Sequence, residues 1–315
     1  MSKKNVVVTG GAGFIGSHLV NLLISKGYNV TVYDNFSNGS GKKNLNSNSR
    51  IIKGSILNYD RMKTVFKNSH MVYNLAVLPL PMSFDRPDIL VKVNDYGTYL
   101  VSKLCTEFKI KLIHVSSSEA YGTARYSTMN ESHPLLPTTV YAASKASSES
   151  YVRAYQQQKN LNCVIVRPFN AYGEFMRQDG YGAAIPKFFD RLSKNLPPLI
   201  DGDGNQTRDL THVSDTANGI YLSSITPDAE GGTFNIAQGK EVTINSLAKI
   251  MIEEFSKLSG KKLDLKLKYR KERPGDVRRH LGDISLSKKI LKYSPEINLR
   301  EGIKKYISWR FNNLN

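Results

Sequence analysis

The sequence has few cysteines and no long apolar segment. Its only two cysteines, Cys105 and Cys163, occur in a chain of 315 residues. This excludes a disulfide-built fold and favours a reducing compartment. No run of about 18 apolar residues is present, so no membrane-spanning helix is expected. The apolar stretch near the N-terminus reaches Gly10 too soon for a signal peptide. We therefore expect a cytoplasmic protein with no membrane partner.

Acidic residues are also scarce relative to basic ones. Asp and Glu total 27 against 44 Lys and Arg, which gives a net charge of +17. Such an excess is typical of some nucleic-acid-binding proteins. Here, however, 11 of the 17 net positive charges lie between Lys257 and Arg310. We interpret that segment as a solvated basic face, with an anionic small molecule such as a diphosphate as the functional alternative, and we expect no nucleic-acid partner.

Short apolar segments alternate with helical periods over the first half of the chain. Strands are expected at 5–9, 28–33, 50–54, 71–76, 111–116 and 162–167, and helices at 15–26, near 96–108 and near 144–159. Continuous apolar strands are buried on both faces, and helices between them force parallel crossovers. The pattern predicts an α/β fold of the Rossmann type, with a doubly wound parallel sheet.

The pattern changes after residue 167, where prolines and glycines break the chain into shorter elements. A strand is expected at 233–236 and a helix at 244–258. We therefore predict a dinucleotide-binding domain at residues 1–167. A smaller, irregular C-terminal domain at residues 168–315 is expected to bind the substrate, with segments that return to the first domain.

A glycine-rich turn lies between the first strand and the first helix, with Gly10, Gly13 and Gly16 at its key positions. Glycines allow a tight turn and let backbone amides approach a pyrophosphate at the helix N-terminus. The second strand ends in Asp34, 18 residues after Gly16. A carboxylate there would accept the adenosine ribose hydroxyls and repel a 2′-phosphate. The pattern therefore predicts NAD rather than NADP as the cofactor.

Tyr141 and Lys145 are four residues apart, a spacing that places them on one helix face. An ammonium group nearby, together with a positive nicotinamide, is expected to lower the pKa of the phenol from about 10 toward neutrality. The phenolate could then take a hydroxyl proton while a hydride leaves for NAD. The hydroxyls of Ser116, Ser117 and Ser118, at the end of the fifth strand, could hydrogen-bond the reacting oxygen.

Taken together, these motifs resemble an extended short-chain dehydrogenase/reductase of the NAD-dependent epimerase/dehydratase family, which acts on nucleotide sugars. The resemblance covers nearly the whole chain. It includes the glycine turn, Asn74-Leu75-Ala76, Asn94 with Gly97-Thr98, Tyr141 with Lys145, residues 167–173 (Arg-Pro-Phe-Asn-Ala-Tyr-Gly), Gln206-Thr207-Arg208-Asp209 and Arg273-Pro274-Gly275-Asp276.

The resemblance implies a role for each matching residue. Tyr141 would be the catalytic base, Lys145 would bind the nicotinamide ribose and tune Tyr141, and Ser117 would bond the reacting oxygen. Cofactor contacts are implied at Gly10, Gly13, Phe14, Ile15, Gly16, Asp34, Asn35, Ser55, Ile56, Leu75, Ala76, Asn94, Tyr141, Lys145 and Pro168. Substrate contacts are implied at Ser117, Ser118, Asn170, Leu199, Arg208, Arg273 and Asp276. No metal site is predicted.

The motifs identify the family better than they identify the reaction. The overall pattern favours a 4-epimerase of a nucleotide-diphosphate hexose of the UDP-glucose type. Glu119, two residues after Ser117, resembles the acid/base residue of 4,6-dehydratases and of UDP-glucuronate decarboxylases, and these reactions are the alternatives. Asp201 stands where the family often has an aromatic residue that stacks the base, so the nucleotide stays open. A non-catalytic NAD- or nucleic-acid-binding protein is the alternative of another class.

The resemblance also implies a homodimer. In the family two helices of each subunit pair across the interface, and here these are the helices near 96–108 and 144–159.

Overall fold

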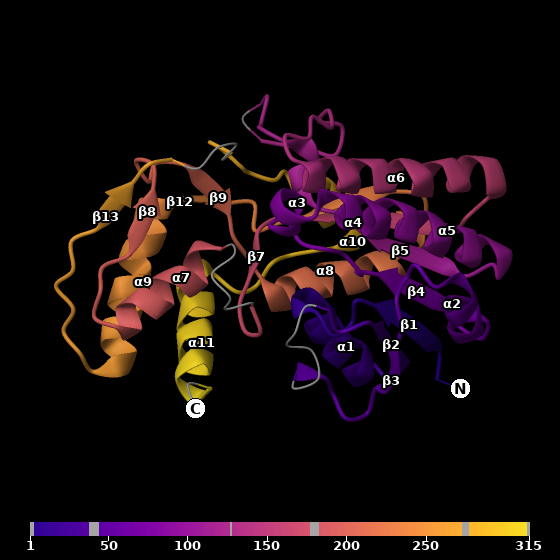
Figure 1. The fold of residues 1–315 in the computed structure, drawn as a ribbon, viewed down its shortest axis with the longest axis horizontal. Helices are drawn as coiled ribbons and strands as arrows, with labels where there is room; N and C mark the ends of the chain where they lie inside the picture. The colour runs from indigo at the N-terminus through magenta and orange to yellow at the C-terminus, as the bar shows by residue number, and fades with distance from the viewer. Residues whose placement is uncertain (1–2, 38–43, 127, 177–182, 273–276, 314–315) are drawn as a thin grey trace.

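Seven parallel strands form the centre of the larger lobe in the computed structural model, which describes residues 3–37, 44–126, 128–176, 183–272 and 277–313 (Figure 1). The sheet order is β11-β6-β5-β4-β1-β2-β3, and every neighbouring pair is parallel. The strands are β1 (Asn5–Thr9), β2 (Asn29–Asp34), β3 (Arg50–Lys53), β4 (Met71–Asn74), β5 (Lys111–Val115), β6 (Cys163–Pro168) and β11 (Thr233–Ile236). This order confirms the predicted doubly wound fold.

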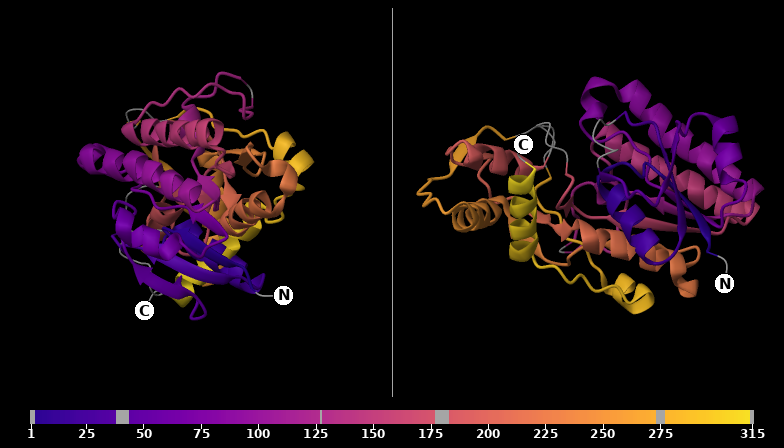
Figure 2. Two further views of the ribbon diagram at one scale, coloured as in Figure 1. Left: turned by 90° about the vertical axis from the view of Figure 1, so that its right-hand side faces the viewer. Right: turned by 90° about the horizontal axis from the view of Figure 1, so that it is seen from below.

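Helices cover both faces of the sheet because its strands are apolar on both sides. Along β1, Val6 and Val8 point to one face and Val7 to the other. The first face is covered by α1 (Phe14–Ser25), α8 (Val213–Ile225) and α10 (Ser285–Leu291). The second is covered by α2 (Tyr59–Phe66), α5 (Gly97–Glu107) and α6 (Val140–Lys159), and Figure 2 shows the layers from two more sides.

The smaller lobe has a hydrophobic core of its own, built by α7 (Ala184–Ser193), α9 (Ile244–Ser259) and α11 (Leu299–Asn312). Phe189 of α7 meets Phe255 of α9 with 5.5 Å between ring centroids. Short two-stranded sheets surround this core. They are β8 (Leu199–Asp201) with β13 (Lys268–Arg270), β9 (Thr207–Asp209) with β12 (Glu241–Thr243), and β7 (Ala171–Tyr172) with β10 (Thr211–His212).

Two elements from the second half of the sequence belong to the larger lobe. β11 pairs with β6 as the last strand of the sheet, and α8 packs on α1. A division after residue 167 therefore separates β11 from the other strands of the sheet. The assignment of cofactor binding to residues 1–167 and of substrate binding to residues 168–315 stays a prediction.

Short helical segments connect the main elements. They are α3 (Met82–Asp85), α4 (Pro87–Val91), the π-helix η2 (Lys92–Tyr96) and the 3₁₀-helices η3 (Ser118–Tyr121) and η4 (Pro227–Ala229). The sequence did not predict η2, α8 or α11. The helix expected near 144–159, with Tyr141 in its opening turn, is α6, which begins at Val140 because Thr139 caps it, accepting a hydrogen bond from the backbone N–H of Ala142 at 3.1 Å.

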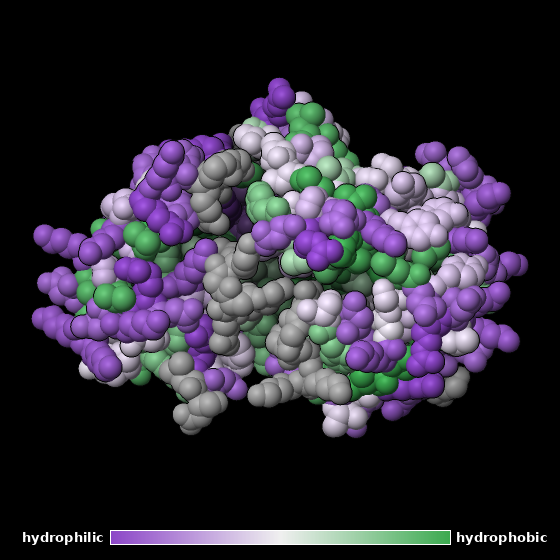
Figure 3. Space-filling view, viewed as in Figure 1, coloured by the Kyte–Doolittle hydropathy of each residue, from purple (hydrophilic) through white to green (hydrophobic). Residues whose placement is uncertain are grey.

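Hydrophilic side chains dominate the surface of the smaller lobe on the face shown in Figure 3. Several arginines of the basic segment form ion pairs there: Arg278 with Asp203 at 2.8 Å and Arg279 with Glu241 at 2.6 Å. Within the described ranges, no helix has the length and apolarity needed to cross a bilayer.

Candidate active site

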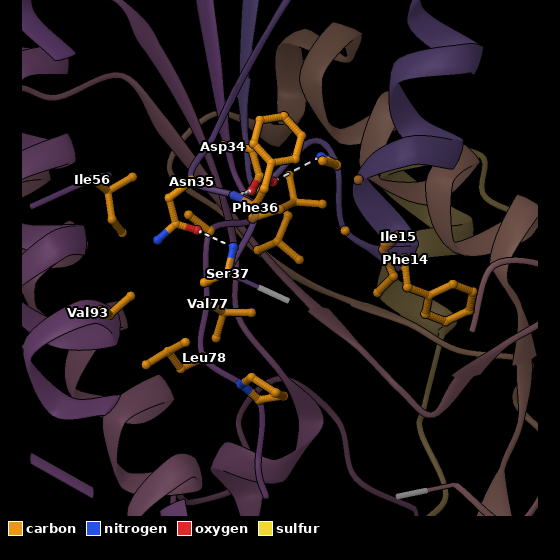
Figure 4. A pocket seen from close by; sticks show the side chains of 18 of the residues that line it. Phe14, Ile15, Asp34, Asn35, Phe36, Ser37, Ile56, Val77, Leu78 and Val93 are labelled. Carbon is orange, nitrogen blue, oxygen red and sulfur yellow. Dashed lines mark hydrogen bonds between the residues drawn. The ribbon is translucent and has the colours of Figure 1, made fainter. Parts of the chain in front are cut away.

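A cavity of about 390 Å³ opens where β1, β2 and β4 end. β1 lies between β2 and β4, so the chain order reverses at this point of the sheet, and crevices at such reversals are where α/β proteins bind ligands. Figure 4 shows side chains from the end of β2, the start of α1 and the 77–78 segment around the cavity. The predicted cofactor residues that line it are Gly10, Gly13, Phe14, Ile15, Gly16, Asp34, Asn35, Ser55, Ile56, Leu75, Ala76, Tyr141 and Lys145.

The glycine turn leaves no room for side chains at two of its three key positions. A Cβ at Gly10 would lie 2.6 Å from the backbone N of Ala76, and Gly10 also has a φ of +68°. A Cβ at Gly16 would lie 2.3 Å from the carbonyl oxygen of Gly10. Gly13 is the N-cap of α1 and supplies no side-chain cap. The first amides of α1 thus face the cavity edge, an arrangement that suits a pyrophosphate.

Asp34 connects the glycine turn to the end of β2. One carboxylate oxygen accepts a hydrogen bond from the backbone N–H of Ala12 at 3.0 Å, and the other accepts one from Phe36 at 2.8 Å. Each oxygen has a further lone pair, and Asp34 lines the cavity. The residues present therefore fit a dinucleotide with free ribose hydroxyls.

Two predicted cofactor residues do not line the cavity. The side chain of Asn94 holds the 77–78 segment instead, because its Oδ1 accepts from the backbone N–H of Leu78 at 2.9 Å and its Nδ2 donates to Ser144 Oγ at 3.0 Å. Pro168 is buried at the end of β6, opposite Ile236 of β11.

Tyr141 and Lys145 both face the cavity from the first turns of α6. Lys145 is 5% exposed, and its Nζ donates a hydrogen bond to the carbonyl oxygen of Val115 at 2.7 Å. Burial lowers the pKa of Lys145 to about 8, whereas the charges of Glu149 and Asp95 act to raise it. The end of β5 therefore holds the ammonium group of Lys145 near the first turn of α6, which carries Tyr141.

The protein without a cofactor does not make Tyr141 acidic; the expected fall of its pKa included the charge of a bound nicotinamide, so it stays a prediction. Burial raises the pKa of Tyr141 to about 12, and the nearby charge of Glu119 adds to the increase. A hydrogen bond from Ser117 opposes the shift. The ammonium group of Lys145 donates to the Val115 carbonyl and is not among the groups that shift the pKa of Tyr141, so the expected acidity would need the further positive charge of a bound nicotinamide.

Ser117 and Glu119 come from the turn that follows β5. Ser117 caps the 3₁₀-helix η3, where its Oγ accepts from the backbone N–H of Glu119 at 3.2 Å. Glu119 is half-buried and close enough to Tyr141 for its charge to act on the phenol. The structure thus brings Ser117, Glu119 and Tyr141 together, as predicted from three separate positions in the sequence.

Among the predicted substrate residues, Asn170, Leu199 and Arg208 do not line the cavity. The Nδ2 of Asn170 lies 3.1 Å from His280 Nδ1, and Nε2 of the same imidazole lies 3.4 Å from the carbonyl oxygen of Ser118, which is buried. Arg208 donates to the carbonyl oxygen of Val277 at 2.6 Å. Leu199 is half-buried in β8, and Arg273 and Asp276 lie outside the described residues.

His280 was missed by sequence reasoning although it links two predicted substrate residues. Burial lowers the pKa of His280 to about 4, with the charge of Arg208 adding to the effect. A neutral ring in the Nε2–H form fits both contacts, accepting from Asn170 and donating to Ser118. Its place a few residues after the Arg273 motif was the only signal available.

Ser116 was grouped with Ser117 and Ser118 from the sequence but was not assigned a role of its own. It is buried and lines the cavity, and its Oγ makes no hydrogen bond to any part of the chain that the structure describes. A buried hydroxyl without a partner is costly, so it indicates a site where a ligand supplies the partner.

Comparison with known proteins agrees with this geometry. The sequence model of the family described as GDP-mannose 4,6 dehydratase matches residues 7–306. The chain belongs to the NAD-dependent epimerase/dehydratase family. A putative UDP-glucose 4-epimerase of Methanocaldococcus jannaschii is 34% identical to it, over 98% of this chain and 99% of the relative.

Solved structures of the family resemble the chain over its full length. A UDP-N-acetylglucosamine 4-epimerase of Methanobrevibacter ruminantium M1, in complex with UDP-N-acetylmuramic acid, is 34% identical, with a TM-score of 0.91 over 99% of this chain and all of the other. A dTDP-glucose 4,6-dehydratase of Streptomyces venezuelae, solved with NAD bound, is 26% identical, with a TM-score of 0.89 over 98% of this chain and 97% of the other. The chain is therefore an NAD-dependent enzyme that modifies nucleotide sugars.

Proposed function

We propose that this family member is a 4-epimerase of a nucleotide-diphosphate hexose of the UDP-glucose type. The observation that carries the proposal is that Tyr141 and Lys145 line the same cavity as the glycine turn, with Ser117 hydrogen-bonded to the phenol. A base, a cation and a hydroxyl beside a dinucleotide turn suffice for removing and returning hydrogen at one carbon. The similar epimerases reported above support this reading.

In the proposed reaction, bound NAD supplies the hydride acceptor and, on return, the hydride donor. Tyr141 takes the proton of the C4 hydroxyl as the C4–H bond of the sugar breaks. It returns that proton when the C4 ketone is reduced on its opposite face. Ser117 holds the reacting oxygen through its hydroxyl. Lys145 contributes a fixed positive charge to the nicotinamide ribose. We propose that Gly10, Gly13, Gly16 and Asp34 hold the cofactor.

The second candidate is a 4,6-dehydratase, or a uronate decarboxylase, that uses Glu119. The charge of Glu119 acts on Tyr141, so its carboxyl group lies close enough to the phenol to be an acid/base beside the same sugar. A dehydratase needs such a group to abstract the C5 proton and expel the C6 hydroxyl. The similar dehydratase reported above shows that the fold hosts this chemistry.

Product analysis tests both candidates. The protein is incubated with UDP-, dTDP- and GDP-hexoses and with a UDP-uronic acid, and products are identified by mass spectrometry and proton NMR. Conversion to a product of unchanged mass with inverted C4 is expected. Loss of water or of carbon dioxide would refute the epimerase and favour the Glu119 route.

Two variants assign the residues. Tyr141→Phe should abolish conversion while NAD still binds, because only the proton-accepting oxygen is lost; retained turnover would contradict the role of Tyr141. Glu119→Gln should leave an epimerase with its product unchanged, whereas a dehydratase would lose its dehydrated product.

We also propose that the chain forms a homodimer through α5 and α6. Tyr96, at the end of η2 next to α5, is 50% exposed and Tyr151 of α6 is 40% exposed, and Tyr99 of α5 lies between them with ring centroids 5.7 and 6.0 Å away. Exposed aromatic clusters are typical of protein interfaces. A monomeric mass by light scattering at micromolar concentration would contradict this proposal.

The two cysteines, both free and buried, support our expectation of a cytoplasmic location.

A further inference from the structure

A buried hydrogen-bond network runs from the end of β1 to α6. Thr9, the last residue of β1, donates from Oγ1 to Asn74 Oδ1 at 2.7 Å. Nδ2 of Asn74 lies 3.3 Å from Nδ1 of His114, and Nε2 of the same imidazole lies 3.0 Å from Ser148 Oγ. Ser148 donates in turn to the backbone carbonyl oxygen of Lys145 at 2.8 Å. The glycine turn starts directly after Thr9, so the network connects that turn with the part of α6 that carries Lys145.

The donors and acceptors of this network match when His114 is neutral and carries its proton on Nε2. The amide nitrogen of Asn74 can only donate, so Nδ1 of His114 accepts. Ser148 uses its single proton on the Lys145 carbonyl, so its oxygen accepts from the Nε2–H group. Burial lowers the pKa of His114 well below its usual range, which keeps the ring neutral.

Water has little access to the four side chains of the network. Thr9 and Ser148 are 0% exposed, and Asn74 and His114 are each 1% exposed. Solvent cannot replace a partner lost at such a site, so a broken bond leaves a buried polar group unsatisfied. We therefore expect the network to constrain the spacing of the strands and the helix that it joins.

A second contact joins β5 to Lys145. Val115, the residue after His114, accepts a hydrogen bond from Lys145 Nζ at 2.7 Å. β5 thus holds the ammonium group of Lys145 directly and its backbone carbonyl through Ser148. A serine hydroxyl often bonds a carbonyl of its own helix, and that bond alone would tie α6 only to itself. The imidazole of His114 turns it into a contact between a strand and a helix.

We propose that His114 and Ser148 are positioning residues that hold Lys145 at a fixed place relative to the glycine turn. Neither of them lines the cavity, so they act through the backbone of α6 rather than on a ligand. The consequence for catalysis rests on the proposed function of Lys145. The position of Lys145 is a property of the protein itself.

The first test measures how firmly Lys145 is held. The protein, saturated with NAD, is treated with the N-hydroxysuccinimide ester of acetate, and the acetylation rate of each lysine is followed by peptide mass spectrometry. The Lys145 rate is expressed relative to that of Lys159, which is exposed at the end of the same helix. Ser148→Ala should raise this ratio about fivefold, the factor expected for one lost neutral hydrogen bond. An unchanged ratio would overturn the proposal.

Ser150→Ala is the matched control on α6. The Ser150 hydroxyl also bonds a carbonyl of its own helix, that of Ala146 at 3.2 Å, but it lies on the exposed face. The acetylation ratio should not change in this variant. Lys111 of β5, which donates to the Ser224 carbonyl at 2.8 Å, reports on the rest of the fold. A rise at Lys111 equal to that at Lys145 in Ser148→Ala would show general loosening and would overturn the proposal.

Two substitutions of His114 test the imidazole itself. His114→Asn keeps an acceptor for Asn74 but is too short to reach Ser148, so it should raise the acetylation ratio as Ser148→Ala does. His114→Gln has a longer side chain whose amide N–H can donate to Ser148, so its ratio should stay close to that of the unmodified protein. Equal rises in the two variants would overturn the role of the Nε2–H group.

The second test uses turnover of whichever nucleotide sugar the product analysis identifies. Ser148→Ala should lower kcat about fivefold and change KM less than twofold, because the proposed role of Lys145 lies in the chemical step. Adding His114→Asn should cost less than it does alone, since both changes remove the same bond. An unchanged kcat, or losses that multiply fully, would overturn the proposal. Should no sugar be converted, the proposed function fails, while the acetylation rates still decide how Lys145 is held.

Discussion

Replacing Arg167 by methionine should destabilise the protein strongly, because it leaves a buried carboxylate without its partner. The side chains of Arg167 and Glu149 are 2% and 1% exposed, and they form two hydrogen bonds of 2.9 and 2.6 Å. Arg167 also donates to the Tyr121 hydroxyl at 2.8 Å. Breaking one partner of such a pair costs about 3–5 kcal/mol, since the remaining charge stays desolvated.

Arg300 offers a matched control on the surface. It also bonds two carboxylate oxygens, those of Glu253 and Glu254 at 2.8 and 2.5 Å, but its side chain is 48% exposed. Glu253 is 53% exposed to water, and Glu254, although only 6% exposed, keeps the ammonium group of Lys257 at 3.0 Å. Neither carboxylate is left buried and unpaired, so Arg300→Met should cost at most about 1 kcal/mol. Both arginines bond two carboxylate oxygens, so the difference in the loss of unfolding free energy between the two variants measures the effect of burial.

The assay is urea denaturation at pH 7 and constant protein concentration, followed by far-UV circular dichroism. A third protein, Arg167→Met with Glu149→Gln, removes the stranded charge and should recover about half of the loss. The reasoning is refuted if Arg167→Met costs no more than Arg300→Met, or if the double variant is no more stable than Arg167→Met alone.

Two further outcomes follow from the site. Lys145→Met should abolish turnover yet stabilise the fold at pH 7 by about 2 kcal/mol. Burial lowers the amine pKa from 10.5 to about 8, which disfavours the folded ammonium by about 3 kcal/mol below pH 8, and losing its hydrogen bond to the Val115 carbonyl offsets about 1 kcal/mol of the gain. That penalty disappears as the pH rises from about 8 toward 10.5, because the folded protein then holds fewer protons than the unfolded one. The gain in unfolding free energy measured by urea denaturation should therefore shrink by pH 10. A gain independent of pH would contradict the burial argument. Gly16→Ala should weaken NAD binding by calorimetry about tenfold or more, because its Cβ would lie 2.3 Å from the Gly10 carbonyl oxygen. Gly27→Ala, after the end of α1, meets open space but has a φ of +85°, so it should lower the stability of the fold while leaving NAD affinity unchanged.

The parts of the fold that the sequence predicted are those set by local patterns. The glycine turn between β1 and α1, the six strands of the first half and β11 are each recognisable from a few neighbouring residues. Asp34 could be assigned because a strand end fixes where its side chain points. These features need only strand periodicity and turn chemistry.

Contacts between distant segments were beyond sequence reasoning. His280 meets Asn170 and Ser118 across 110 and 162 residues of chain, so no local pattern announces it. The pKa of Tyr141 in the protein alone was also beyond sequence reasoning, because it depends on burial and on the position of the Lys145 ammonium group, and neither follows from their spacing. The π-turn η2 escaped for a similar reason, since its sequence reads as ordinary helix.

The pairing of β11 with β6 has a consequence for how the protein is made. The backbone groups of β6 on that side find their partners only when Thr233–Ile236 has been synthesised, some way after Cys163–Pro168. A nascent chain that ends before β11 therefore carries an open, apolar sheet edge, the kind of surface that invites association with other chains. The nucleotide-binding lobe of this enzyme cannot be completed on the ribosome before much of the smaller lobe has also emerged.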